Sequence, residues 1–389
     1  MTASHQTPLS IVRTVSSRLT PIPAPSRAPR HERALFFGSC QQCAGLKRNA
    51  SKITVPQRPL RVGAGFRSIT YSTQPKLSRE YSSSTKEYPS STPHEPIIHH
   101  VFEPTTGTFQ YIVTDSSSNA AVIIDPVLDF DPATATISTA SADALFALVA
   151  ERRYNVEYIL ETHAHADHLS AASYLQAKLM QSQSQTPRIG IGKRIGQVQK
   201  LFSKRYGVPA HEHTIAFDKL FDDDETFRVG SLQIQAIHLP GHTPDHMGYK
   251  TGSHVFCGDS LFHADIGTAR TDFPGGSAQQ LWQSGQKLLA LPDETSIWTG
   301  HDYPPADRTM PVPFMTVRQH KEANKHLKSG MTEDSFVKAR RERDAALAAP
   351  KLLHQSLQIN VRGGKLPEPD EGGRRMLKVP LNLPGIGSW

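Results

Sequence analysis

Four potential metal ligands lie within six positions of this chain. Residues 162–168 read Thr-His-Ala-His-Ala-Asp-His, directly after an apolar run at 156–161 that is typical of a strand. Two histidines two positions apart on extended backbone project to the same side, so one centre can use both. Three imidazoles and a carboxylate are costly to crowd together unless a cation compensates them. The motif therefore predicts a metal site at the carboxyl end of a strand, formed by His163, His165, Asp167 and His168.

Further candidate ligands follow strands downstream. Three times the sequence shows an expected strand, a glycine and then a histidine or aspartate, which places His242, Asp259 and His301 at strand ends. Asp125 also ends a strand and is suited to hydrogen-bond a ligand histidine from outside the metal shell. His238 and His246 do not follow a turn glycine, so we expect them at the surface or outside the metal shell. We expect Cys257 to be a small buried thiol.

Strands and helices alternate from about residue 96 onward, which predicts an α/β fold with sheets covered by helices. A hairpin is expected from the apolar runs at 109–113 and 120–124. Helices are expected at 142–153, with Ser141 as the N-cap, and at 169–180. Further strands are expected at 188–191, 232–239, 247–249, 254–257 and 296–298.

The positive charge is concentrated at the N-terminus. Of the formal net charge of +7, residues 1–92 carry 14 Lys/Arg and three Glu, a net of +11, which leaves −4 for the remainder. Dispersed arginines among serines, with few acids, are typical of a mitochondrial transit peptide followed by a disordered linker. We expect cleavage near 79–82 and discount the pair Cys40 and Cys43 because they fall in this segment. The destination would be the mitochondrial matrix.

The rest divides into an expected catalytic domain at 93–310 and a C-terminal appendage at 311–389. The appendage contains a charged helical segment at 335–349 and ends in a Pro/Gly-rich stretch. We expect it to pack on the catalytic domain. No apolar run approaches the roughly 20 residues that span a bilayer, so we expect no membrane partner.

The ligand series resembles the metallo-β-lactamase superfamily, which implies an αββα sandwich over about residues 97–310. Within it, 258–262 (GDSLF), 267–276 (GTARTDFPGG) and 300–303 (GHDY) look like the persulfide dioxygenases, and in particular their bacterial β-lactamase-like hydrolase branch. The segments 291–295 (LPDET) and 360–362 (NVR) extend this likeness into the appendage. The well-known mitochondrial members differ at 267–270, where they carry Gly-Cys-Gly-Arg. The chain also departs from their pattern at 244–246 (PDH), near the expected substrate loops.

The resemblance implies one Fe(II) per chain, which activates O2 against glutathione persulfide to give sulfite and glutathione in mitochondrial sulfide detoxification. Carried over by motif, the iron ligands would be His163, His242 and Asp259, a facial triad with open positions. His165, Asp167, His168 and His301 would lie outside the iron shell, although the same positions bind metal in dinuclear relatives. Arg270 and Tyr303 would hold the glutathione moiety.

Three alternatives compete with this interpretation. A glyoxalase II-like dizinc thioester hydrolase would use the same residues, with Asp167, His168 and His301 at a second zinc site and Asp259 bridging. A nucleic-acid-binding protein is disfavoured, since the chain after residue 92 is acidic and would repel phosphate. A non-catalytic metal-stabilised scaffold is disfavoured by the open coordination positions. The sequence does not decide the oligomeric state; a homodimer is one assembly it allows.

Overall fold

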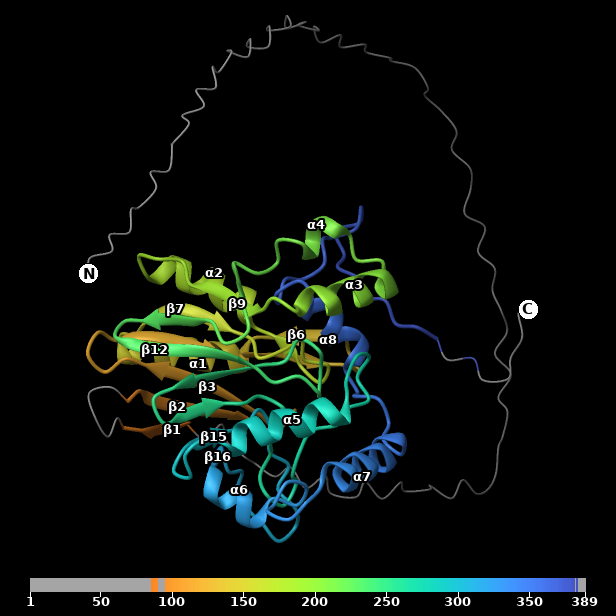
Figure 1. Cartoon of the computed structure of the whole chain (residues 1–389). Coiled ribbons are helices and arrows are strands. Elements are labelled where there is room, and N and C mark those ends of the chain that lie inside the picture. Colours follow the sequence, from red (N-terminus) through yellow and green to blue (C-terminus); the bar gives the residue numbers. More distant parts are fainter. Residues whose placement is uncertain (1–84, 90–94, 382, 384–389) are drawn as a thin grey trace, which may run out of the picture. The chain divides into compact units, whose positions relative to one another are not determined.

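Two β-sheets face each other in the computed structural model, which describes residues 85–89, 95–381 and 383 (Figure 1). The first sheet has seven strands in the order β1 Thr85–Tyr88, β2 Ile97–Glu103, β3 Thr108–Thr114, β4 Ala120–Ile124, β7 Asn155–Leu160, β9 Arg188–Gly192 and β10 Lys219–Phe221. The second has six, in the order β11 Thr226–Val229, β12 Leu232–His238, β13 Met247–Thr251, β14 His254–Phe256, β15 Ser296–Trp298 and β16 Phe314–Thr316.

Side-chain alternation builds three apolar layers. On β4, Val122 and Ile124 point between the two sheets, where they join residues such as Tyr249 and Trp298 of the second sheet. Ala121 and Ile123 point to the other face. That face is covered by α1 (Ala140–Arg152) and α2 (Ala172–Ser182), and the outer face of the second sheet is covered by α5 (Ala278–Leu289). The order helix, sheet, sheet, helix confirms the predicted αββα sandwich.

The C-terminal part packs on this sandwich through α6 (Val317–Ala323), α7 (Glu333–Ala345) and α8 (Leu353–Asn360). Phe336 of α7 joins the apolar layer beneath α5. Ile359 of α8 joins the layer beneath α1 and α2, while Leu357 packs with α3 (Ile195–Tyr206). A short helix, α4 (Ala210–His213), follows α3. In the described part of the chain, no helix combines the length and the apolar character needed to cross a membrane.

Some local predictions were wrong. Helix α1 begins two residues earlier than expected; Thr139 is its N-cap, and the Ser141 hydroxyl instead donates to Asp129 Oδ1 at 2.6 Å. The helix expected at 169–180 starts only at α2, because Leu169–Ser170 forms β8, which pairs with β5 (Val127–Asp131) and so belongs to a small sheet completed by β6 (Thr136–Ser138). The linker expected to end at residue 92 contains β1, which pairs antiparallel with β2. The expected transit peptide, cleavage site and Cys40–Cys43 pair lie outside the described residues.

The predicted ligand loops all leave the same edge of the sandwich. Strands β14 and β15 are parallel, and β12 is parallel to both because two antiparallel pairings separate it from β14. The loops after β12, β14 and β15 carry His242, Asp259 and His301, respectively. In the facing sheet, the segment 162–168 follows β7. Strand direction therefore brings ligands from distant parts of the sequence to one place.

Candidate metal centre

The predicted ligands form two adjacent groups at this edge. The first group consists of His163, His242 and Asp259, and the second of His165, Asp167, His168 and His301. In each group, one possible donor atom from every residue lies within 4.8 Å of the donor atoms of the others. Asp259 lies between them: Oδ2 is 3.6 Å from His242 Nε2 and Oδ1 is 3.5 Å from His301 Nε2. Two cations could therefore share its carboxylate, or one could use it with the first group.

Several donor atoms at this site are buried without a hydrogen-bond partner among the described residues. They are His163 Nε2, His165 Nδ1, His168 Nε2, His301 Nε2, Asp167 Oδ2 and Asp259 Oδ1. Two of these atoms, His301 Nε2 and Asp167 Oδ2, lie 3.1 Å apart and would pair only if the ring were protonated. An unsatisfied buried polar atom costs about 1–3 kcal/mol, so this cluster needs compensation. Imidazole nitrogen and carboxylate oxygen are ligands of iron and zinc. The residues present therefore fit a bound metal ion.

A buried chain of hydrogen bonds orients His163. Its Nδ1 lies 3.0 Å from Thr162 Oγ1, and the Thr162 hydroxyl donates to Asp125 Oδ2 at 2.8 Å. The Thr162 hydroxyl proton is thus directed to the carboxylate, so Thr162 Oγ1 accepts from His163 Nδ1–H. The lone pair of His163 is left on Nε2, the atom that faces the site. Such outer partners set the tautomer and orientation of metal-binding histidines.

Two other histidines are oriented by main-chain carbonyls. His242 Nδ1 lies 2.8 Å from the carbonyl of Arg270, to which it donates. His168 Nδ1 lies 3.2 Å from the carbonyl of Leu169. In both rings the outer nitrogen is the donor, so Nε2 carries the free lone pair at the site.

His165 differs from the other histidines. Its Nε2 lies 3.1 Å from Asp125 Oδ1 and 3.3 Å from Glu161 Oε2, both buried. Burial alone would lower the pKa of His165, but the two carboxylates raise it well above its ordinary value. Only Nδ1 is left to face the second group. His165 can bind metal through Nδ1 when neutral, and as an imidazolium it cannot.

Asp245 and His246 support the ligands from outside the metal groups. A position outside the metal shell was one of the two expected for His246, whereas no role was predicted for Asp245. Asp245 Oδ2 accepts the N–H of Ala164 at 2.9 Å, and His246 Nε2 accepts the N–H of Asp259 at 3.0 Å. The ring of His246 also stacks on that of His163, with centroids 4.7 Å apart. Both side chains are fully buried, so of the two positions expected for His246 the one outside the metal shell is confirmed and the surface position is not. His238 lies apart from both metal groups, near Asp223.

The glycines before Asp259 and His301 leave room for the ligands. Gly258 has φ +48°, and a Cβ there would lie 2.6 Å from Thr162 Oγ1. A Cβ on Gly300 would lie 2.5 Å from Asp259 Oδ1. Real Cβ atoms do not approach other atoms so closely. The recurrent strand–glycine–ligand pattern therefore has a steric cause at these two positions.

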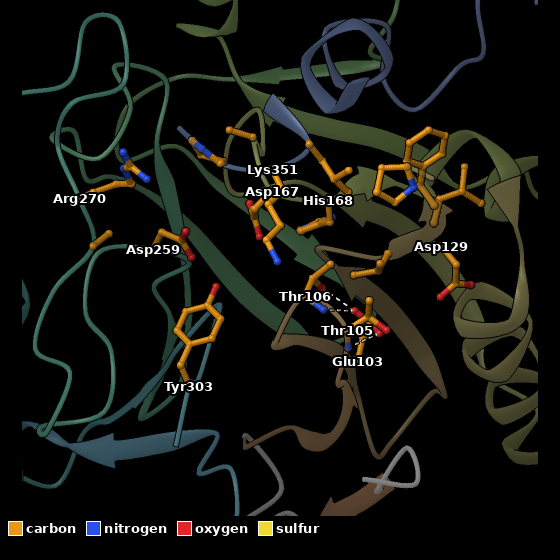
Figure 2. Close-up of a pocket in the computed structure, with 18 of the residues that line it drawn as sticks. Glu103, Thr105, Thr106, Asp129, Asp167, His168, Asp259, Arg270, Tyr303 and Lys351 are labelled. Carbon is orange, nitrogen blue, oxygen red and sulfur yellow. Dashed lines mark hydrogen bonds between the residues drawn. The ribbon is translucent and has the colours of Figure 1, made fainter. Parts of the chain in front are cut away.

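A cavity of about 970 Å³ opens beside the metal groups (Figure 2). Its wall includes the β5–β6 hairpin, the loop that carries Arg270, and residues of α7 and of the segment before α8. Tyr303 stacks on the His301 ring at 9° and directs its hydroxyl into the cavity, on the side of Asp259. Tyr303 is 51% exposed, so the ring face that does not contact His301 is open to a ligand.

Arg270 lines the cavity, but its guanidinium is already engaged. Nε and Nη2 each donate to the Asp272 carboxylate at 2.6 Å, and Nη1 donates to the Ala348 carbonyl at 2.8 Å. The bidentate face expected to hold a substrate carboxylate is thus taken by Asp272. Two other cations of the wall, Arg343 and Lys351, make no side-chain hydrogen bond or ion pair with any described residue, and Lys351 reaches into the cavity in Figure 2.

The fold and ligand geometry can now be compared with known proteins. Residues 104–301 match the family model of the metallo-beta-lactamase superfamily, just over half of the chain. The chain belongs to this superfamily. A beta-lactamase hydrolase-like protein of Xylella fastidiosa is 45% identical over 295 residues, covering 76% of this chain and 67% of that protein. Glyoxylase B2 of Dictyostelium discoideum is 44% identical over 283 residues, covering 71% and 94%.

Persulfide dioxygenases of this superfamily are more distant relatives. The mitochondrial persulfide dioxygenase ETHE1 of Homo sapiens is 31% identical over 210 residues, 53% of this chain and 68% of that protein. Among solved structures, ETHE1 from Myxococcus xanthus aligns with a TM-score of 0.54 and 27% identity, covering 69% of this chain and all of that one. The chain is therefore a metallo-beta-lactamase-fold protein related to both hydrolase-like and dioxygenase members.

Proposed function

We propose that the protein is an Fe(II)-dependent persulfide dioxygenase that converts glutathione persulfide, O2 and water to sulfite and glutathione. The observation that carries the proposal is the group His163, His242 and Asp259, which offers two imidazoles and one carboxylate while Nε2 of the adjacent His165 is directed to Asp125 and Glu161. Two histidines and one carboxylate with open positions are typical of non-haem Fe(II) oxygenases. The likeness to ETHE1 proteins supports the same activity.

The residues of the chain have separate roles in this reaction. Bound iron would supply open coordination positions for the persulfide sulfur and for O2. His163, His242 and Asp259 hold it, and the Asp125–Thr162 chain fixes the ring of His163. Tyr303 offers a ring face and a hydroxyl to the substrate at the cavity side of the site. The cavity is large enough to take a tripeptide thiol derivative, because ligand sites usually span about 300–1,000 Å³.

The free cations of the cavity wall suit an anionic substrate. Glutathione carries two carboxylates and one ammonium group, and Arg343 and Lys351 present positive charge without a partner among the described residues. We propose that these two residues bind the substrate carboxylates in place of Arg270, because the guanidinium group of Arg270 is already bound by Asp272. Arg270 would then join its own loop to the segment before α8.

Replacing Arg343 tests this assignment. Loss of a hydrogen bond to a charged group costs about 1.5–3 kcal/mol, so Arg343→Ala should raise KM for glutathione persulfide roughly tenfold or more, with kcat and metal content retained. Arg341→Ala is the matched control, since Arg341 lies on the exposed side of the same helix and does not line the cavity. Steady-state O2 uptake gives both constants. Equal KM values for the two variants would remove Arg343 from the substrate site.

A second candidate is a glyoxalase II-like dizinc thioester hydrolase. It is favoured by the completeness of the second group, in which His301 Nε2 lies 3.1 Å from Asp167 Oδ2, and by the relative named Glyoxylase B2. The two candidates differ in their use of O2. Assays of the same preparation with glutathione persulfide and with S-lactoylglutathione separate them: fast thioester hydrolysis without O2 consumption would support the hydrolase and contradict the dioxygenase.

We further propose that the protein works in the mitochondrial matrix, with residues 1–92 containing the import signal. The charge distribution supports this, as does the mitochondrial location in the name of the human relative. Fusing residues 1–92 to a fluorescent protein tests it, with a fusion that starts at residue 85, and so keeps strand β1, as the control. Mitochondrial fluorescence is expected only for the first fusion.

A further inference from the structure

Asn360, the last residue of α8, contacts the predicted metal loop directly. Its Nδ2 donates to the carbonyl of His165 at 2.8 Å and to the carbonyl of His168 at 2.9 Å. Its Oδ1 accepts the N–H of Ser170 at 2.8 Å. The side chain is buried and lies outside the segment matched by the superfamily model, which ends at residue 301. A residue of the C-terminal part thus holds the centre of the ligand motif.

These three bonds match the bonding capacity of an asparagine amide. The NH₂ group has two donors and each finds one carbonyl, while the oxygen accepts from the main chain two residues beyond His168. The planar amide fixes the separation of the two carbonyls and hence the backbone on both sides of Asp167. Both histidines and Asp167 belong to the second ligand group. An aspartate would place an oxygen against two carbonyl oxygens.

Helix α8 is itself firmly anchored, so Asn360 can act as a fixed support. The carbonyl of Val361 accepts from Gln199 Nε2 at 3.0 Å, and the buried Arg362 pairs with Glu212. Ile359 lies in the apolar layer beneath α1 and α2, and Leu357 packs against α3. The position of Asn360 is therefore set by the domain and not by the loop that it holds.

We infer that Asn360 is a positioning residue that fixes the backbone which carries His165, Asp167 and His168 at the metal centre, which makes the C-terminal helix part of that centre. The inference rests on the metal binding proposed above. In the dizinc alternative these residues would bind the second zinc, and in the iron enzyme they would support the iron group from outside, through His165 beside the His163 ring and His301 beside Asp259. Partners outside the metal shell often change metal affinity by about 10–100-fold. The alternative is that Asn360 only fastens α8 to the domain.

Gln358 on the same helix provides a matched control. Its side chain also makes three hydrogen bonds: Nε2 donates to the carbonyls of His354 and Lys378, and Oε1 accepts the N–H of Lys378. These bonds fasten the chain's tail and do not reach the metal loop. If the role of Asn360 is only to fasten α8, the variants Asn360→Ala and Gln358→Ala should behave alike.

The test is Co(II) titration of metal-free full-length protein, followed by visible absorption, together with the melting temperature of the metal-free form. For Asn360→Ala we expect a Co(II) dissociation constant at least tenfold higher than in the wild type and a changed absorption spectrum. For Gln358→Ala we expect the melting temperature to fall about as much as in Asn360→Ala, while the Co(II) dissociation constant and the absorption spectrum stay at their wild-type values. Asn360→Asp, which keeps the acceptor oxygen, should show the same metal defect as Asn360→Ala.

Wild-type affinity and spectrum in Asn360→Ala would overturn the inference, as would equal metal defects in Asn360→Ala and Gln358→Ala. Failure of both Asn360 variants to fold, while Gln358→Ala folds, would also overturn it, because Asn360 would then support the whole domain and not the loop selectively. If the wild type bound no Co(II), the proposed metal-dependent function itself would fail.

Discussion

Asp259→Ala should abolish both metal binding and catalysis. One carboxylate oxygen of Asp259 faces His242 in the first ligand group, and the other faces His301 in the second. Its removal leaves several histidine nitrogens buried together, with no carboxylate to balance the charge of a cation in the first group. The loss of affinity should exceed the 10–100-fold that removal of an outer partner costs.

Metal content after dialysis and O2 uptake on glutathione persulfide measure this prediction. Asp222→Ala is the control, because Asp222 is an exposed aspartate that pairs with Lys193 at the surface. The control should keep wild-type metal and activity, since exposed ion pairs contribute little. His163→Ala should match Asp259→Ala. Retention of stoichiometric iron in either ligand variant would refute the assignment of His163, His242 and Asp259.

Gly300→Ala should damage the metal centre while leaving every ligand in place. The added Cβ would lie 2.5 Å from Asp259 Oδ1 and 3.0 Å from the Gly258 carbonyl carbon. The main chain at Gly300 cannot easily shift away from this contact, because its N–H donates a hydrogen bond to the Gly258 carbonyl at 2.8 Å. Overpacking of this kind costs about 1–3 kcal/mol of stability. The Asp259 carboxylate is the most movable neighbour, so metal affinity should fall more than tenfold.

Gly196→Ala is the matched control, since a Cβ on Gly196 would meet no atom within 4 Å. Gly196 lies in helix α3, where alanine is favoured over glycine by about 1 kcal/mol. The control should therefore bind metal normally and melt at the same or a higher temperature. Metal titration and thermal unfolding of the two variants test the comparison. Unchanged metal affinity in Gly300→Ala would show that the tight contact is not needed for the site.

The sequence predicted the parts of the site that follow from local pattern. Apolar runs and turn residues located the strands, and the ligands follow strands whose directions bring them to one edge. The motif at 163–168 could be recognised because its residues are adjacent in the chain. The resemblance to known enzymes then supplied the αββα arrangement that the structure shows. The same approach failed where a side chain's partner is distant in sequence.

Three residues illustrate that limit. Arg270 was expected to hold substrate, but nothing in the sequence shows that Asp272 and the Ala348 carbonyl occupy its guanidinium. Asp245 was noted only as part of a departure from the family pattern, yet its carboxylate accepts the N–H of Ala164, which lies 81 positions earlier in the chain. Asn360 was noted only as part of a family-like segment; its contact with the motif spans 192 positions to His168.

The central claim is that a metal held by His163, His242 and Asp259 catalyses persulfide oxidation by O2. The most direct measurement combines the metal content of protein purified without added metal with the O2 consumed and sulfite formed from glutathione persulfide. We expect about one iron per chain, and one O2 consumed for each sulfite. Stoichiometric zinc with no O2 consumption and fast thioester hydrolysis would contradict it.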